Sequence, residues 1–134
     1  IAVAAASLHG VSFGAEIMPR LIDEIPALSV AALFAEGDTV ITGAGELRVK
    51  ETDRLRAIAT EFQKLAPGSI EEREDGLIIH GKTEIQRAQV SSYGDHRMAM
   101  SLAVLGAAAK GVIIEEPDCV NISYPTFFSE IEAL

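Results

Sequence analysis

Apolar positions recur at the helical period most clearly in the middle of the first half of the chain. They fall at spacings of three, four and three: Leu55, Ile58, Phe62 and Leu65. This spacing predicts an amphipathic helix over residues 50–65. Residues 26–36 differ because apolar side chains occur on every side, which predicts a helix that is buried all round and ended by Gly37.

Two further helices are expected in the second half. Asp95 is suited to cap a helix over residues 96–110, a stretch rich in small apolar residues. A terminal helix is expected to start at Ser123-Tyr124-Pro125, because proline is tolerated in a first helical turn.

Short β-branched or alternating runs predict the strands. They occupy residues 39–42, 69–73, 77–80, 84–91 and 112–114, with two less distinct runs at 1–6 and 11–17. The Asp-Gly turn signal in Glu74-Asp75-Gly76 joins two of these runs into a β-hairpin.

The two halves of the chain repeat one order of elements. Placing Ser29 on Ser101 superposes two apolar helices, each followed by a glycine and a β-branched strand. We therefore expect residues 1–134 to be one partial domain, with one repeat over about 1–82 and a second, truncated repeat over about 83–134.

Composition and charge exclude several classes of protein. The chain has 134 residues and a formal net charge of −9. This charge argues against nucleic-acid or anionic-membrane partners, since both need a basic face. No apolar run is long enough to span a membrane, and the single Cys119 fits a reducing, cytoplasmic compartment. The chain does not begin with methionine, so we expect it to be cut from inside a longer protein.

Charge is concentrated at residues 48–55, where the amphipathic helix is expected to begin. Cations at a helix N-terminus oppose the macrodipole, whose N-terminal end already carries about half a positive charge. Arg97 stands in the first turn of another apolar helix and would accept the same penalty. We infer that Arg54 and Arg97 bind one anionic ligand beside an acid-base carboxylate, Glu51. A local surface ion pair between Glu51 and Arg54 is the alternative that remains open.

His96 has two interpretations. We favour a polar residue satisfied at a buried helix start, and a ligand contact is the alternative. Asp95 and His96 lack partner ligands for a metal ion, so no metal site is predicted.

Four segments, in order, resemble the C-terminal half of the 5-enolpyruvylshikimate-3-phosphate synthase family. They are Leu21-Ile22-Asp23-Glu24-Ile25-Pro26, Leu47-Arg48-Val49-Lys50-Glu51-Thr52-Asp53-Arg54-Leu55, Gly94-Asp95-His96-Arg97-Met98-Ala99-Met100 and Ser123-Tyr124-Pro125-Thr126-Phe127-Phe128. The resemblance implies an α/β (α+β) fold of repeated βαβαββ units, an inside-out barrel with helices inside and sheets outside. It also implies transfer of the enolpyruvyl group of phosphoenolpyruvate to the 5-hydroxyl of shikimate 3-phosphate, with release of phosphate. By the same resemblance, the reaction belongs to the shikimate route to chorismate and aromatic amino acids, and it requires no metal or organic cofactor. The enzyme of this family is a glyphosate target.

The same resemblance implies roles for individual residues. Asp23 would take the proton from the attacking hydroxyl, and Glu51 would protonate the methylene of phosphoenolpyruvate. Arg54 and Arg97 would clamp its phosphate and carboxylate. The residues implied in substrate binding are Lys50, Arg54, Arg97 and His96.

Two positions depart from the pattern of some family members. Glu46 stands where an asparagine touches the shikimate substrate, and Ile122 where a lysine occurs. Because family members are much longer, the resemblance implies that the N-terminal domain of the parent chain is missing here, and we expect this fragment alone to be inactive. Two alternatives are a passive phosphate-binding module and the related enzyme that acts on UDP-N-acetylglucosamine, but the segments around Glu51 and Arg97 favour the shikimate enzyme.

Overall fold

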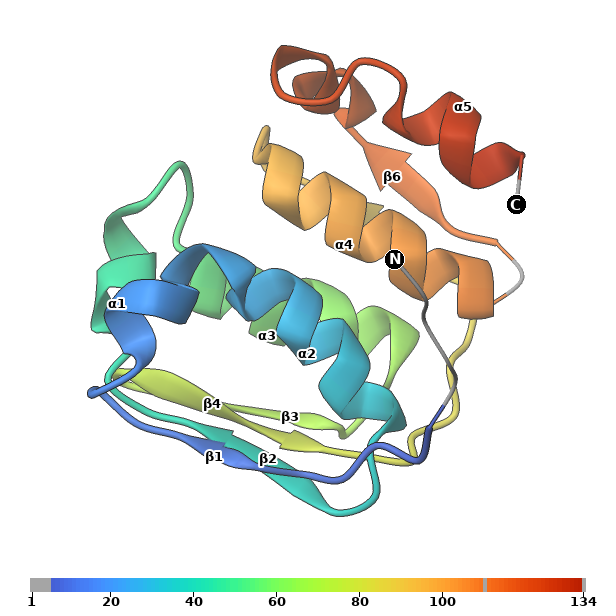
Figure 1. Cartoon of the computed structure of the whole chain (residues 1–134). Coiled ribbons are helices and arrows are strands. Elements are labelled where there is room, and N and C mark those ends of the chain that lie inside the picture. The colour runs from blue at the N-terminus through green and yellow to red at the C-terminus, as the bar shows by residue number, and fades with distance from the viewer. Residues whose placement is uncertain (1–5, 110, 134) are drawn as a thin grey trace.

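The computed structural model describes residues 6–109 and 111–133, and its longest helices lie between two sheets (Figure 1). In chain order the elements are β1 (Ser12–Phe13), α1 (Met18–Leu21), the 3-10 helix η1 (Ile22–Glu24), α2 (Ile25–Phe34), β2 (Asp38–Ile41), the 3-10 helix η2 (Gly45–Val49), α3 (Arg54–Leu65), β3 (Ile70–Arg73), β4 (Gly76–His80), β5 (Gln89–Ser91), α4 (His96–Ala108), β6 (Ile113–Glu115), the 3-10 helix η3 (Pro117–Ile122) and α5 (Phe127–Glu132). A four-stranded sheet in the order β1-β2-β4-β3 forms one outer layer, and α2, α3 and α4 pack against one another above it. The pair β5-β6 and α5 lie beyond α4, so the α/β class with helices inside is confirmed.

The four-stranded sheet is mixed. β1 pairs parallel with β2, whereas β2 and β3 both pair antiparallel with β4. The predicted hairpin is confirmed, although Gly76 already belongs to β4 and pairs with Arg73. A Cβ at Gly76 would lie 1.8 Å from the carbonyl oxygen of Ile41 in β2, so only glycine lets β4 approach β2 this closely.

Helix α3 begins at Arg54, four positions after the predicted start at Lys50. Asp53 caps the helix because its Oδ1 accepts a hydrogen bond from the backbone N of Arg56 at 3.0 Å. The 3-10 helix η2 precedes it and ends at Val49. Apolar spacing alone missed this cap, but it placed the buried face correctly. The four residues at 0% exposure are Leu55, Ile58, Phe62 and Leu65.

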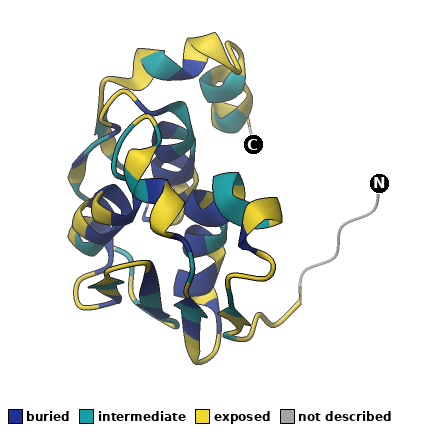
Figure 2. Cartoon of the chain, turned by 90° about the vertical axis from the view of Figure 1, so that its left-hand side faces the viewer, coloured by how far each residue is buried: buried dark blue, intermediate teal, exposed yellow. Residues whose placement is uncertain are grey.

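The prediction that α2 is buried all round is wrong. Ala27, Ala31 and Phe34 are exposed, while the other sides of α2 contact α3, α4 and β4. Buried residues gather between the layers, and the C-terminal part of the chain is largely exposed (Figure 2). Apolar composition makes burial possible on each side of a helix, but packing neighbours decide which sides are covered. The helix ends at an extended Ala35, two residues before Gly37 with its φ of +87°.

The predicted strand over 84–91 is wrong except for its last three residues. Gln86 donates its backbone N–H to the carbonyl of Leu65 at 2.8 Å, so this segment closes the end of α3 instead of pairing with a strand. Only Gln89–Ser91 pairs, in parallel with β6.

The expected strand over 11–17 is also shorter, because Ser12–Phe13 alone pairs and Pro19 lies in the first turn of α1. The expected strand over 1–6 falls almost entirely outside the described residues.

Near the C-terminal end, Pro117 begins η3, and α5 starts at Phe127 rather than at the expected Ser123. The expected division into two repeats near residue 82 stays a prediction. Within the described part of the chain, no helix is long and apolar enough to cross a membrane.

Candidate active site

Arg54 lies where the starts of α2, α3 and α4 meet, and its side chain is 1% exposed. Its Nε donates to Asp95 Oδ2 at 2.7 Å, and its Nη1 donates to Asp23 Oδ1 at 2.9 Å. Its Nη2 donates to Glu51 Oε2 at 2.6 Å and lies 3.4 Å from Asp95 Oδ1. Every guanidinium nitrogen therefore faces a carboxylate.

Asp95 is fully buried, and its carboxylate both caps α4 and pairs with Arg54 of α3. Its Oδ1 accepts hydrogen bonds from the backbone N of Arg97 at 2.9 Å and of Met98 at 3.4 Å, which confirms the predicted cap of α4. Its Oδ2 binds Arg54, so one carboxylate ties α3 to α4. Burial works to lower the pKa of Arg54, but the hydrogen bond and charge of Asp95, together with Glu51 and Asp23, outweigh it and raise that pKa.

Asp23 belongs to η1, immediately before α2. Lys50 Nζ lies 3.7 Å from its Oδ1. Partial burial pushes the pKa of Asp23 upward, but the hydrogen bond from Arg54 and the charges of Lys50 and Arg97 outweigh this and lower the pKa. Asp23 is therefore ionised at neutral pH and can accept a proton.

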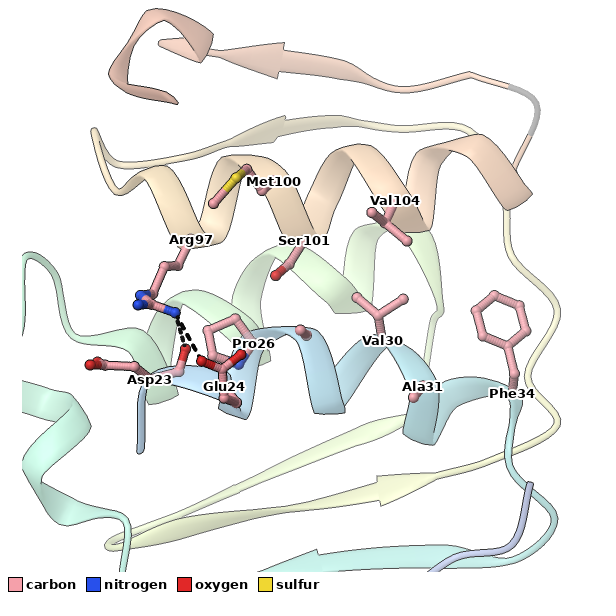
Figure 3. Close-up of a pocket in the computed structure, with 11 residues that line it drawn as sticks. Asp23, Glu24, Pro26, Val30, Ala31, Phe34, Arg97, Met100, Ser101 and Val104 are labelled. Carbon is pink, nitrogen blue, oxygen red and sulfur yellow. Dashed lines mark hydrogen bonds and ion pairs between the residues drawn. The ribbon is translucent and has the colours of Figure 1, made fainter. Parts of the chain in front are cut away.

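Arg97 reaches from α4 to the start of α2 (Figure 3). Its Nη1 donates to the backbone oxygen of Asp23 at 2.9 Å and lies 3.4 Å from Glu24 Oε1. These groups stand at one end of a cavity of about 410 Å³ between α2 and α4. The apolar lining includes Val30, Phe34, Met100 and Val104.

Lys50 and Glu51 precede α3, so the interpretation that Lys50 stands in the first helical turn is wrong. Lys50 Nζ lies 3.0 Å from Glu46 Oε1, and this hydrogen bond raises the pKa of Lys50. Glu51 keeps a side chain that is 51% exposed at the rim of the site. His96 is the first residue of α4 and is half-buried, and its ring has no hydrogen-bond partner among the residues that the structure describes.

Carboxylates outnumber cations at this site. The three cations are Lys50, Arg54 and Arg97, and the five carboxylates within 4 Å of them are Asp23, Glu24, Glu46, Glu51 and Asp95. Carboxylates of the chain itself thus compensate the cations at both helix starts. These cations therefore do not by themselves indicate an external anion. In the described ranges, no three His, Cys, Asp or Glu side chains are grouped to hold a metal ion.

Helices enclosed between sheets, with carboxylates and guanidinium groups gathered at converging helix starts, define an α/β chain whose charged site lies where its inner helices begin. The comparison with known families is more specific. The family model of EPSP synthase (3-phosphoshikimate 1-carboxyvinyltransferase) matches residues 2–131, and the chain belongs to this family.

Named relatives agree with this family. Proteins named 3-phosphoshikimate 1-carboxyvinyltransferase from Bacillus cereus (strain G9842) and Bacillus thuringiensis (strain Al Hakam) are each 49% identical over 135 residues, which is 100% of this chain but 31% of each relative. An EPSP synthase structure from Acinetobacter baumannii superposes with a TM-score of 0.85 at 38% identity, covering 95% of this chain and 30% of that one. The chain therefore spans less than a third of the length of these relatives.

Proposed function

We propose that this chain is part of an enzyme that transfers the enolpyruvyl group of phosphoenolpyruvate to the 5-hydroxyl of shikimate 3-phosphate and releases phosphate. The observation that carries the proposal is the placement of two carboxylates on one guanidinium, with Asp23 at Nη1 and Glu51 at Nη2 of Arg54. Addition of an alcohol across an enol double bond needs a base at the oxygen and an acid at the carbon. The names of the relatives support the same reaction.

In this proposal Asp23 accepts the hydroxyl proton while the oxygen forms a bond to C2 of phosphoenolpyruvate. Glu51 gives a proton to C3, which becomes a methyl group in the adduct. Glu51 then takes back a methyl proton while the bond between C2 and the phosphate oxygen breaks, which restores the double bond. The proton held by Asp23 passes to the leaving phosphate. Arg54 and Arg97 hold the phosphate and carboxylate charges throughout. The residues proposed to bind the remaining parts of the substrates are Lys50, near the shikimate phosphate, and His96.

Arg54 must exchange some of its protein partners to bind a substrate anion. Asp95 is fully buried and stays in place, whereas the side chains of Asp23 and Glu51 are 45% and 51% exposed and can turn from the guanidinium toward the reacting atoms of the substrates. An anion would then meet the freed Nη1 and Nη2 atoms. Because carboxylates outnumber cations here, we propose that further cations come from parts of a longer cytoplasmic protein and that this chain alone has little turnover.

A hybrid enzyme tests the proposed reaction. This chain replaces the matching stretch of the Bacillus cereus relative, and phosphate release is measured with both substrates. We expect an active hybrid that loses roughly 100-fold or more of its rate in Glu51→Gln and in Asp23→Asn. The exposed Glu84→Gln is the matched control and should keep full activity. A folded hybrid without phosphate release, or full activity in both site variants, would refute the proposal.

Calorimetry of the isolated chain with phosphoenolpyruvate tests the alternative of a passive phosphate-binding module. Binding that is abolished by Arg54→Ala and by Arg97→Ala, together with an inactive hybrid, would favour that alternative. The pairing of both arginines with protein carboxylates leads us to expect weak binding by the isolated chain.

A further inference from the structure

Glu61 is a buried carboxylate that the proposed reaction does not use. It lies in the middle of α3, seven positions after Arg54, with a side chain that is 1% exposed. Its oxygens accept hydrogen bonds from Lys64 Nζ at 2.6 Å, Tyr93 Oη at 2.7 Å and the backbone N of Ser91 at 2.9 Å. A buried charge is tolerated only when it is paired and hydrogen-bonded, and these three donors meet that condition.

The partners of Glu61 show that it does more than neutralise a lysine. Lys64 belongs to the same helix and would be enough for a local ion pair. Ser91 instead ends β5, and Tyr93 lies in the segment between β5 and α4, both about thirty positions away along the chain. Burial of Glu61 raises its pKa, but these hydrogen bonds outweigh that effect and lower it, while Glu61 raises the pKa of Tyr93 to about 12. The Glu61 carboxylate therefore stays ionised and the Tyr93 hydroxyl stays protonated across the neutral pH range, so their hydrogen bond persists.

The segment that Glu61 holds has a backbone that needs support. Tyr93 has a φ of +54° and Gly94 a φ of +68°, so two consecutive residues are left-handed and one of them carries a side chain. Such a conformation is unfavourable for a residue other than glycine and persists only when its surroundings fix it. The hydroxyl of Tyr93 provides such a fixed point on α3.

Asp95 follows this segment directly, and Arg97 comes two residues later. The position of residues 91–94 along the axis of α3 therefore determines where α4 begins. It also determines where Asp95 meets Arg54 and how far Arg97 lies from Arg54. We propose that Glu61 is a positioning residue, which holds Ser91 and Tyr93 on α3 and so fixes the spacing of the two arginines that clamp the substrate anion. This inference rests on the proposed function, and Glu61 itself touches neither the site nor its ligands.

The test uses steady-state kinetics of the hybrid enzyme with Glu61→Gln, Tyr93→Phe and the double variant. Loss of one hydrogen bond to a charged group should raise the KM for phosphoenolpyruvate roughly tenfold. The KM for shikimate 3-phosphate should change less than the KM for phosphoenolpyruvate. The double variant should resemble Glu61→Gln, because both substitutions open the same contact.

The chain offers a matched control in the pair of Tyr124 and Glu130, whose Oη and Oε2 atoms lie 2.6 Å apart on the exposed C-terminal segment. Tyr124→Phe and Glu130→Gln should leave both KM values unchanged. Equal changes in both KM values in Glu61→Gln, or no change in either Glu61→Gln or Tyr93→Phe, would overturn the positioning role.

Hydrogen exchange of the isolated chain separates this inference from the proposed function. If the hybrid has no activity, the proposed function fails, and the positioning role is decided by the amides of residues 93–98. In Tyr93→Phe, which removes only a hydroxyl group, these amides should exchange several-fold faster while the buried amides of α3 keep their rates. Unchanged exchange at 93–98 would contradict the positioning role even if the hybrid is active.

Discussion

Substitution of Asp95 gives the sharpest test of the structure, because this buried carboxylate both caps α4 and pairs with Arg54. Removing one partner of a buried ion pair costs about 3–5 kcal/mol, and we take the lower end because Arg54 keeps two other carboxylates. Loss of an N-cap adds about 1 kcal/mol. Asp95→Ala should therefore lower the free energy of unfolding by about 4 kcal/mol.

Asp95→Asn separates the two contributions, because asparagine caps a helix about as well as aspartate. It should cost about 3 kcal/mol, nearly all from the lost ion pair. Urea unfolding followed by circular dichroism measures both values, with the exposed Asp118→Asn as a control expected to lie within about 0.5 kcal/mol of the unsubstituted chain.

A double-mutant cycle with Arg54→Met decides whether the pairing is the cause. The double variant Arg54→Met, Asp95→Asn removes both buried charges, so its cost should fall below the sum of the single costs by at least about 1 kcal/mol. A coupling near zero, or an Asp95→Ala variant as stable as the unsubstituted chain, would refute the described contact between α3 and α4.

Two further outcomes are expected from other charge clusters. Arg48 donates hydrogen bonds to Asp53, to Glu72 and to two backbone carbonyls of the β3–β4 hairpin. Arg48→Lys should therefore lower the free energy of unfolding in urea by roughly 1–3 kcal/mol, whereas Arg56→Lys at an exposed position should lower it by under about 0.5 kcal/mol. Equal costs would contradict the role of the planar guanidinium. His80 hydrogen-bonds Asp38 and Glu71, which raise its pKa, so its stabilising contribution should be full below the unfolded pKa of about 6.5 and lost as the pH rises through the folded value. His80→Gln should then be destabilising by up to about 1 kcal/mol at pH 5.5 and neutral at pH 9, and a pH-independent difference would contradict this origin.

Sequence patterns predicted the elements whose stability is local. The buried face of α3, the hairpin and the cap at Asp95 all depend on residues within a few positions of one another, and all three are confirmed. The failures have a different origin. The exposed face of α2 and the unpaired segment before Gln89 depend on which distant elements pack nearby, and local periodicity carries no such information.

The candidate site shows the same division. Motifs named four site residues: Asp23, Glu51, Arg54 and Arg97. The structure brings them together, because Asp23 and Glu51 bind the guanidinium of Arg54 and Arg97 binds the backbone oxygen of Asp23. The pairing of Arg54 with Asp95 joins residues 41 positions apart, and the contact between Glu61 and Tyr93 joins residues 32 apart. Neither contact has a signal in local spacing. Their roles in catalysis or positioning stay predictions.

The structure also changes the argument by which cations at helix starts indicate a ligand. An unfavourable dipole interaction at a helix terminus costs about 0.3–1 kcal/mol, whereas a hydrogen bond to a charged group contributes about 1.5–3 kcal/mol. The bond from Arg54 to the buried Asp95 therefore outweighs the dipole penalty without any ligand. What supports an anion site is the unequal burial of the partners of Arg54. Asp95 is inaccessible and holds the guanidinium in place, while Asp23 and Glu51 are about half exposed, so under the proposed function a substrate anion would take their places on the guanidinium.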